Sequence, residues 1–304
     1  MDLLCVGSVA YDDIETKFDK KENVLGGSAT FASVAASFYC RPAIVGIVGS
    51  DFLPGDMEFL KSRGIDLTSL ETGNGRTFHW KGRYHADMKG RDTLSTELNV
   101  FENFNPSLTE PARKSRIVFL GNIHPALQLK VLDQVKAPFL SAADTMNLWI
   151  DTRRELLELV LRRIDMLFIN DEELHRLTGI SDMGGAAYAI LHEYGLKFLV
   201  VKLGANGSSL FPAGAGKPFH MPAIPVDVRD PTGAGDTFAG GVLGFICRSG
   251  DISVNGVREA MLSGTVLASF CVEGFGPGHL AQVLGEEMNS REAALRKSLS
   301  ELER

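Results

Sequence analysis

The sequence predicts an α/β fold of three layers, with a mostly parallel central sheet and helices on both faces. Short apolar runs alternate with helix-like segments along most of the chain, and such alternation implies crossover connections between parallel strands. The runs contain few polar residues, as expected of strands that are covered on both faces. The expected strands are Leu3–Gly7, Ala43–Val48, Ile117–Leu120, Pro138–Ala142, Met166–Ile169 and Lys197–Lys202.

The expected helices follow from composition and spacing. Ser28–Phe38 is rich in alanine, and Pro54–Arg63 is helix-like and follows the second strand. Thr152–Arg163 has apolar residues at helical spacing. Acidic and basic residues alternate in Gly285–Arg304, which predicts a solvated terminal helix.

Two segments interrupt the alternation and predict a small β lid. The first, Tyr11–Val24, is polar and follows the first strand. The second, Arg76–Leu98, alternates with a period of two residues around a turn that contains glycine. There is no repeat of 20–50 residues and no low-complexity linker. We therefore expect residues 1–304 to form a single domain, with lid insertions at about 11–24 and 76–98.

Composition and charge restrict the class of function. The 304 residues are 44% hydrophobic and 23% charged, and the formal net charge is −7. Proteins that bind nucleic acids or membrane surfaces need a basic face, so neither partner is expected. The apolar start lacks the basic flank of a signal peptide, and no apolar stretch is long enough for a bilayer span. The four cysteines lie in apolar contexts without a CxxC pair, which favours buried thiols in a cytoplasmic protein.

The most informative segment is RDPTGAGDTFAGGVLGF, residues 229–245. A glycine-rich turn leads into small and apolar residues at helical spacing, so a helix should begin near Gly235. The first N–H groups of a helix lack intrahelical partners and favour anions, and glycine lets a phosphate approach them closely. We expect Gly233, Ala234 and Gly235 to form an anion hole for a phosphoryl group. Asp236 would then be the base that accepts a proton from an attacking hydroxyl. The alternative is a tight turn followed by a charge at a helix start.

The same segment resembles a family signature. Asp230 and residues 232–241, TGAGDTFAGG, are similar to the C-terminal signature of the PfkB, or ribokinase-like, carbohydrate kinase family. The resemblance implies a ribokinase-like fold and transfer of the γ-phosphoryl group of ATP to an alcohol. It also implies Mg²⁺ as a cofactor and K⁺, or another monovalent cation, near Asp230.

The resemblance extends to the N-terminal half, where it implies contacts with the acceptor. Asp12 stands at the family's spacing for a carboxylate that holds sugar hydroxyls, and Gly26 and Gly27 match the double-glycine signature before the first helix. Asn122, after the third expected strand, matches a polar substrate contact. The chain departs from the family at Phe31, where an asparagine is frequent, and this departure indicates a different ligand shape.

Further motifs at strand ends are similar to the nucleotide site of the family. Asn170 and Glu173 match its Asn-x-x-Glu motif, which implies that Asn170 contributes to the ATP site and that Glu173 acts on magnesium indirectly, through water. Lys202, Gly204 and Gly207 match a segment that lines the nucleotide. Taken alone, the first motif could be a helix cap and the two glycines a hairpin turn. The residues Asp144 and Asn147, in a DTMN run, are a further candidate near the phosphates.

Other enzyme classes lack their motifs in this chain. There is no GxxxxGK[ST] segment, no GxGxxG after the first strand and no HExxH cluster. With these classes set aside, the resemblance to the PfkB family implies an ATP-dependent kinase acting on a hydroxyl of a small sugar. The alternatives are a nucleoside kinase of the adenosine, inosine or cytidine type, or a catalytically silent member that binds a metabolite. The resemblance also implies a homodimer that forms through exposed lid strands.

Overall fold

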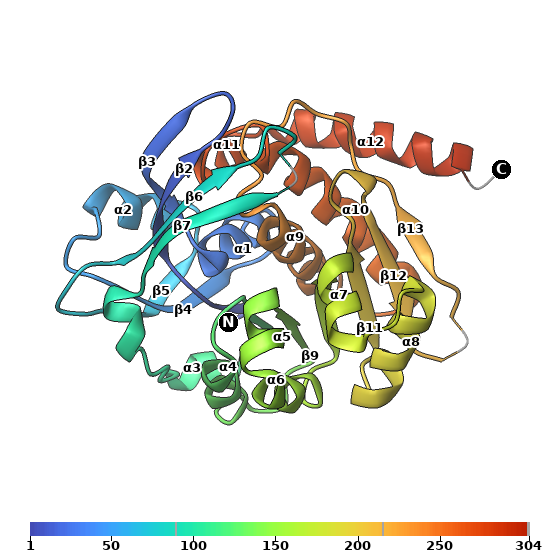
Figure 1. The fold of residues 1–304 in the computed structure, drawn as a ribbon, viewed down its shortest axis with the longest axis horizontal. Helices are drawn as coiled ribbons and strands as arrows, with labels where there is room; N and C mark the ends of the chain where they lie inside the picture. Colours follow the sequence, from blue (N-terminus) through green and yellow to red (C-terminus); the bar gives the residue numbers. More distant parts are fainter. Residues whose placement is uncertain (89, 215, 303–304) are drawn as a thin grey trace.

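The computed structural model describes residues 1–88, 90–214 and 216–302. Its main sheet has nine strands in the order β13-β12-β11-β10-β9-β8-β1-β4-β5 (Figure 1). The strands from β5 to β11 are parallel, and β12 and β13 join antiparallel at one edge. The strands are β1 (Leu3–Val6), β4 (Pro42–Val48), β5 (Asp66–Thr72), β8 (Ile117–Leu120), β9 (Leu140–Asp144), β10 (Met166–Asn170), β11 (Phe198–Lys202), β12 (Ser208–Pro212) and β13 (Phe219–Met221).

Helices cover both faces of this sheet, and alternate residues of its central strands enter two separate cores. Leu3 and Cys5 pack in one core, and Leu4 and Val6 in the other. Residues of the first core come from α1 (Ser28–Ala36), α2 (Pro54–Ser62), α9 (Ala234–Ser249), α10 (Val254–Cys271), α11 (Pro277–Ala281) and α12 (Gly285–Leu302). Residues of the second come from α3 (Glu110–Arg113), α4 (Pro125–Leu132), α5 (Asn147–Thr152), α6 (Arg154–Leu161), α7 (Asp171–Thr178) and α8 (Met183–Tyr194). The three-layer α/β prediction is confirmed.

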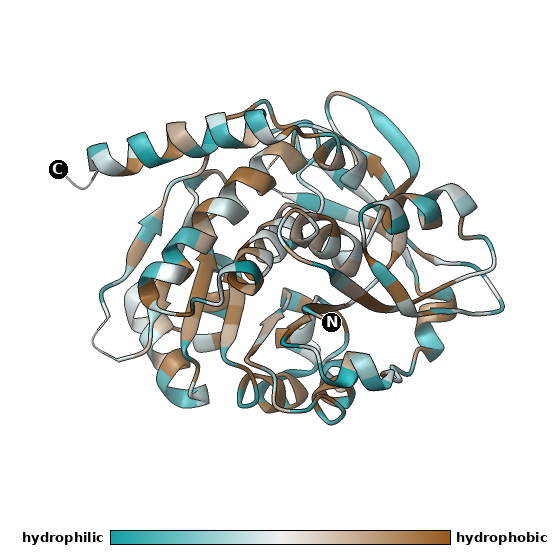
Figure 2. Cartoon of the chain, turned by 180° about the vertical axis from the view of Figure 1, so that it is seen from behind, coloured by the Kyte–Doolittle hydropathy of each residue, from teal (hydrophilic) through white to brown (hydrophobic). Residues whose placement is uncertain are grey.

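The hydropathy of the elements follows this layering. Seen from behind, strands of the main sheet are predominantly hydrophobic, whereas α12 carries many hydrophilic residues, as expected of a solvated terminal helix (Figure 2). The last two residues of the expected range Gly285–Arg304 lie outside the described residues. None of the described helices combines the length and the hydropathy that a bilayer span requires.

Several boundaries differ from the sequence prediction because strand pairing determines them. The strand expected at Pro138–Ala142 is β9, which begins at Leu140 and continues to Asp144. Residues Leu140 to Asp144 are the ones that pair with β8 and β10. Because hydrogen bonding to these neighbours defines the strand, β9 begins and ends two residues later than expected. The polar edge strand β5 was not expected, since DLTSLET has no continuous apolar run.

The two inserted segments pair with each other to form a second sheet of four strands, here called the small sheet. Its order is β3 (Lys20–Gly26), β2 (Ala10–Glu15), β6 (Phe78–Tyr84) and β7 (Arg91–Glu97). Each insertion forms an antiparallel hairpin, and a parallel pairing of β2 with β6 joins the two. Segments that are far apart in sequence thereby form one continuous surface.

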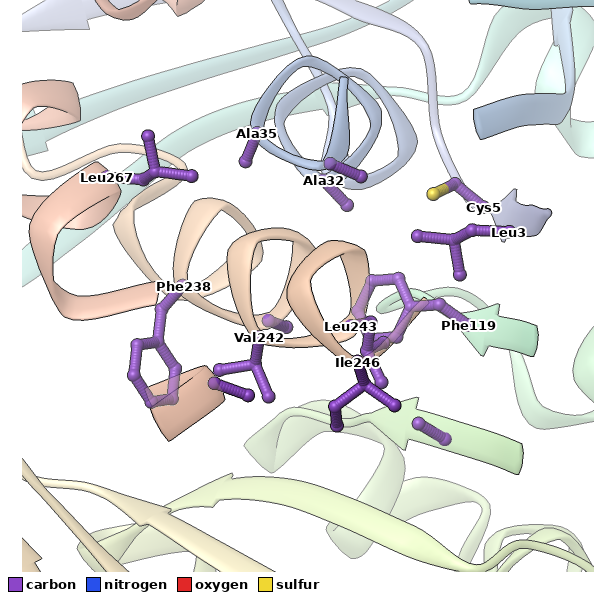
Figure 3. Close-up of a cluster of buried hydrophobic side chains, with 14 of the residues drawn as sticks. Leu3, Cys5, Ala32, Ala35, Phe119, Phe238, Val242, Leu243, Ile246 and Leu267 are labelled. Atoms are coloured by element: carbon purple, nitrogen blue, oxygen red, sulfur yellow. The ribbon is translucent and has the colours of Figure 1, made fainter. Parts of the chain in front are cut away.

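Helix α9 lies directly against α1. Figure 3 shows Ala32 and Ala35 of α1 facing α9, whose Val242 and Leu243 lie within the same core. A Cβ atom at Gly240 would overlap the carbonyl oxygen of Ala32, and one at Gly244 would lie 2.9 Å from the Cα of Ala36. The two backbones can approach this closely only because glycine occupies these positions.

We therefore expect Gly240→Ala to destabilise the protein, although alanine has the higher helix propensity. The added methyl group meets the backbone of α1, and overpacking of this kind costs about 1–3 kcal/mol. Chemical denaturation would measure the change in the free energy of unfolding. Gly285→Ala is the matched control, because nothing lies within 4 Å of its Cβ position. An unchanged stability of Gly240→Ala would show that α1 and α9 are not closely packed.

Candidate functional site

The glycine-rich turn leads directly into α9. Gly233 is the N-cap residue, with a left-handed φ of 74°, and no side chain caps the helix. A Cβ atom at Gly233 would overlap the ring of Phe31, which is buried beneath the turn at 1% exposure. Phe31 therefore supports the turn from below, and its side chain is not exposed to an acceptor. The uncapped helix start leaves backbone donors available for an anion.

The three residues of the expected anion hole are not equivalent. The N–H of Ala234 donates to the carbonyl oxygen of Pro231 at 3.2 Å. A bound phosphoryl oxygen would have to displace this contact. At Gly235, a Cβ atom would lie 3.3 Å from the Nζ of Lys202. The turn therefore brings a fixed positive charge and the helix start to the same place.

Asp236 lies in the first turn of α9 and is partly exposed. Burial of its carboxyl group and the nearby Asp144 carboxylate together raise the pKa of Asp236 to about 7, although the charge of Lys202 opposes both. A carboxylate with a pKa near neutrality can accept a proton from a hydroxyl group and release it again at the pH of the cell. The first turn of a helix also favours the ionised form.

Lys202 forms an ion pair with Asp144 at the carboxyl ends of β11 and β9. Its Nζ lies 2.8 Å from Oδ1 and 2.6 Å from Oδ2 of Asp144, whose side chain is almost fully buried. Burial alone would lower the pKa of Lys202, but the carboxylates of Asp144 and Glu173 outweigh it and raise the pKa. Lys202 therefore stays charged beside the glycine-rich turn. The sequence suggested Asp144 as a candidate but not this pairing.

Asn170 and Glu173 form a capping box at the start of α7. The Asn170 Oδ1 accepts from the N–H of Glu173 at 2.7 Å, and Glu173 Oε2 accepts from the N–H of Asn170 at 3.0 Å. Burial raises the pKa of Glu173 to about 7, and Lys202 lowers it. The helix-cap alternative thus describes the geometry of both side chains. The capping box also holds Glu173, which is only 6% exposed, within electrostatic range of Lys202.

Asp12, on the small sheet, is fitted against the double glycine. A Cβ atom at Gly26 would overlap the Asp12 carboxylate, so a side chain at this position would displace that carboxylate. Gly27 is the N-cap residue of α1, with φ 96°. Burial and, to a smaller extent, the carboxylates of Asp230 and Asp236 raise the pKa of Asp12 to about 8, although Arg91 opposes them. Asp12 is therefore close to the helix start of α9, although the two residues are distant in sequence.

Asp230 is fully buried, and only one of its two carboxylate oxygens has a hydrogen-bond partner among the described residues. Its Oδ1 accepts from the N–H of Thr232 at 2.9 Å, whereas Oδ2 has no hydrogen-bond partner among the described residues. Burial raises the pKa of Asp230 to about 6. A buried, unpartnered carboxylate oxygen is costly unless it is protonated or binds a cation. Asp230 therefore fits a bound monovalent cation.

The remaining predicted site residues are Gly204, Gly207 and Asn122. Gly204 and Gly207 belong to the turn between antiparallel β11 and β12, so the hairpin alternative describes their backbone. Asn122 follows β8, but its amide is already occupied. Its Oδ1 accepts from Trp149 Nε1 at 2.9 Å, and its Nδ2 lies 3.2 Å from Met146 Sδ. An acceptor contact would require this amide to exchange partners.

The small sheet contributes residues that the sequence did not single out. Tyr84 of β6 is buried, and its hydroxyl lies 3.0 Å from Thr232 Oγ1 in the glycine-rich segment. Arg91 of β7 is the register partner of Tyr84, and it lowers the pKa values of Asp12 and Asp236. Period-two alternation in residues 78–84 was the available signal, since it indicates which side chains share a face.

Comparisons with known proteins agree with this arrangement. The sequence model described as "pfkB family carbohydrate kinase" matches residues 2–282. A cytidine kinase of Thermococcus kodakarensis is 30% identical over 249 residues, which are 80% of this chain and 87% of that protein. A 2-dehydro-3-deoxygluconokinase of Thermoproteus tenax is 26% identical over 254 residues, 72% of each chain.

Solved structures show the same fold. The structure of Arabidopsis thaliana ribokinase complexed with ribose and ATP superposes with a TM-score of 0.77 at 22% identity. The superposition covers 95% of this chain and 98% of the ribokinase. The ribokinase-like fold is thus established. The family match over nearly the whole chain assigns the activity class: the chain belongs to the pfkB family of carbohydrate kinases and is a phosphotransferase with an alcohol group as acceptor.

Proposed function

We propose that this kinase transfers the γ-phosphoryl group of ATP to a hydroxyl of a small sugar unit, either free or as part of a nucleoside. The observation that carries the proposal is the position of Asp236. Its carboxylate has a pKa near 7 and lies in the first turn of an uncapped helix, beside Lys202. A catalytically silent member that only binds a metabolite would need neither a tuned base nor an anion site.

In the proposed reaction, Asp236 accepts the proton of the acceptor hydroxyl as its oxygen attacks the γ-phosphorus. The N–H groups at the start of α9 and the charge of Lys202 would stabilise the negative charge on the transferring group. Asp144 keeps Lys202 in place through its two short contacts. Asp12 would hold acceptor hydroxyls, and Lys202, Gly204 and Gly207 would border the nucleotide together with Asn170.

The described carboxylates also fit the proposed metals. Mg²⁺ commonly binds substrate phosphates, waters and few protein carboxylates, and it would offset the charge of the phosphates here. The buried Glu173 could hold one of its waters. The unpartnered Oδ2 of Asp230 supports a K⁺ ion at that position. All residues of β7 are exposed, and a free edge strand of this kind supports a homodimer.

Asp236→Asn should remove the base and preserve the fold. General-base assistance is worth roughly 10²–10⁴-fold in rate, so we expect a loss of kcat in that range with little change in ATP affinity. An assay of ADP release over a panel of sugars and nucleosides measures the rate and identifies the acceptor. Asp227→Asn, an exposed residue before the glycine-rich segment, is the control. More than about a tenth of the wild-type kcat in Asp236→Asn would exclude the assignment.

The pH dependence follows from the same carboxylate. Only ionised Asp236 can accept the proton, so kcat/KM should decrease as the pH falls below about 7, approaching tenfold per pH unit. Asp12 and Glu173 also have raised pKa values. The decrease of kcat/KM at low pH therefore reflects the protonation of all three carboxylates and not of Asp236 alone. A rate that stays constant down to pH 5 would contradict a base with this pKa.

Glu173→Gln separates the metal role from the helix cap. Glutamine can still accept the hydrogen bond of a capping box, but it carries no charge. We expect an unchanged melting temperature and a higher Mg²⁺ concentration at half-maximal rate. Glu173→Ala, which loses both functions, is the comparison. If the magnesium titration of Glu173→Gln matches that of the wild type, the motif only caps α7.

Asp12→Ala should weaken acceptor binding and leave ATP binding unaffected. Above the Asp12 pKa of about 8 the carboxylate is ionised, and a hydrogen bond to a charged group contributes about 1.5–3 kcal/mol. At such a pH the acceptor kcat/KM should fall roughly ten- to a hundredfold. Calorimetry with ATP alone tests the second part. Asp13→Asn is the control, since the neighbouring residue points to the opposite face of β2. Weakened ATP binding with unchanged acceptor KM would mean that Asp12 belongs to the nucleotide site.

A further inference from the structure

The two faces of the small sheet differ in character. One face is charged: His79 Nε2 lies 3.0 Å from Asp13 Oδ1, and Arg83 Nε lies 2.8 Å from Glu15 Oε1. These residues alternate with those of the opposite face, because successive side chains of a strand point in opposite directions. We call the opposite one the inner face, since its Tyr84 reaches Thr232 of the glycine-rich segment.

The inner face places an aromatic side chain beside the proposed acceptor carboxylate. In the parallel pairing of β2 with β6, Asp12 and Trp80 are register partners. Aligned residues on neighbouring strands point to the same face, and the strands are about 4.8 Å apart. That separation is comparable with the distance between the centres of a ribose ring and its attached base.

The indole of Trp80 lies flat on the sheet. A Cβ atom at Gly82, the next inner-face residue of β6, would overlap three carbons of the indole ring. Trp80 Nε1 donates to Thr93 Oγ1 at 3.3 Å, which anchors the edge of the ring. One face of the indole therefore rests on the backbone at Gly82, and the side chain remains partly exposed.

A cation lies near this ring. The guanidinium carbon of Arg91 is 5.4 Å from the centroid of the indole, and Arg91 is exposed. Among the described residues it makes no ion pair within 4.0 Å. Its guanidinium hydrogen-bonds the Tyr84 side chain, and a guanidinium has five N–H donors, so others can serve a carbonyl oxygen of a ligand that covers the indole.

We propose that Trp80 is a stacking platform for the base of a nucleoside acceptor, whose ribose hydroxyls bind Asp12. The inference rests on the proposed function, because it takes Asp12 as the acceptor carboxylate, and it narrows the acceptor to a nucleoside. A flat indole offers a wide apolar surface to a planar heterocycle, and such stacking tolerates different bases. A free sugar bound at Asp12 would leave this surface uncovered. Arg91 favours bases that carry a carbonyl group.

The test is equilibrium binding, measured by calorimetry without ATP so that no turnover is needed. The ligands are cytidine, uridine, inosine, adenosine and ribose, and the variants are Trp80→Ala and Trp80→Phe. Loss of a base–aromatic stack typically weakens binding by roughly one to two orders of magnitude. We expect a loss of that size for nucleosides in Trp80→Ala, an unchanged affinity for ribose, and recovery of most nucleoside affinity in Trp80→Phe.

A second variant tests the geometry while keeping the tryptophan. Gly82→Ala should lift the indole from the sheet and weaken nucleoside binding as Trp80→Ala does. His79→Ala, which changes the charged face of the same strand, is the matched control and should bind nucleosides as the wild type does. Thermal melting establishes that each variant is folded. If Trp80→Ala fails to fold, Gly82→Ala keeps the test decisive, because unchanged nucleoside affinity in a folded Gly82→Ala would overturn the inference.

Two results would overturn the inference. Equal losses for ribose and nucleosides in Trp80→Ala would mean that the indole supports the sugar, and unchanged nucleoside affinity would mean that it only packs. A failure of the proposed kinase function would give results that differ from a failure of the stacking platform. Trp80-dependent nucleoside binding without ADP release would refute the kinase acceptor assignment but not the platform. Phosphorylation of free sugars by a chain that binds no nucleoside would refute the platform alone.

Discussion

The contact between α1 and α9 fixes the position of the glycine-rich turn. Gly240 and Gly244 let the backbone of α9 lie directly against α1, and Phe31 of α1 fills the space beneath Gly233. Because α1 begins at the double glycine that also accommodates Asp12, one packing contact links the two halves of the site. A shift of α9 would move the N–H groups at its start and Asp236 relative to Phe31 and the rest of α1. Close packing of α1 against α9 thus determines where the residues of the candidate site lie. A small change in side-chain volume at this interface would affect both the packing and the positions of those residues.

The second constraint is electrostatic. Asp12, Asp230, Asp236 and Glu173 all have raised pKa values, because burial disfavours the ionised forms. Neighbouring carboxylates add repulsion at Asp12, Asp236 and Glu173. Lys202 offsets part of this repulsion, although its closest partner is Asp144. Perturbed carboxylates of this kind are typical of functional sites rather than of stable cores. A ligand with bound cations would relieve the repulsion, and for this reason the cluster suits a metal–phosphate substrate.

Phe31 and Asn122 show where residue-by-residue resemblance is insufficient. Phe31 stands where the family frequently has a polar residue, and the sequence indicated a changed ligand contact. In the structure the ring is buried against Gly233 of the glycine-rich turn. Asn122 has the expected residue type, yet its amide is bonded to Trp149 and Met146. A motif gives the residue type at a position, but neighbouring side chains decide where that side chain points.

The sequence by itself determined the fold class and the glycine-rich helix start. Both depend on local properties: apolar periodicity, and glycines before a segment of helical spacing. The capping box at Asn170 and Glu173 was likewise readable as an alternative, because its spacing is local. The sequence did not predict that β2 pairs with β6, and this pairing places Trp80 beside Asp12 and Tyr84 against Thr232. Strand partners across such a separation are selected by which surfaces can be buried together, and no local pattern specifies that choice. Likewise, the ion pair of Lys202 with Asp144 and the pKa values of the buried carboxylates exist only once the strand ends meet at one edge of the sheet.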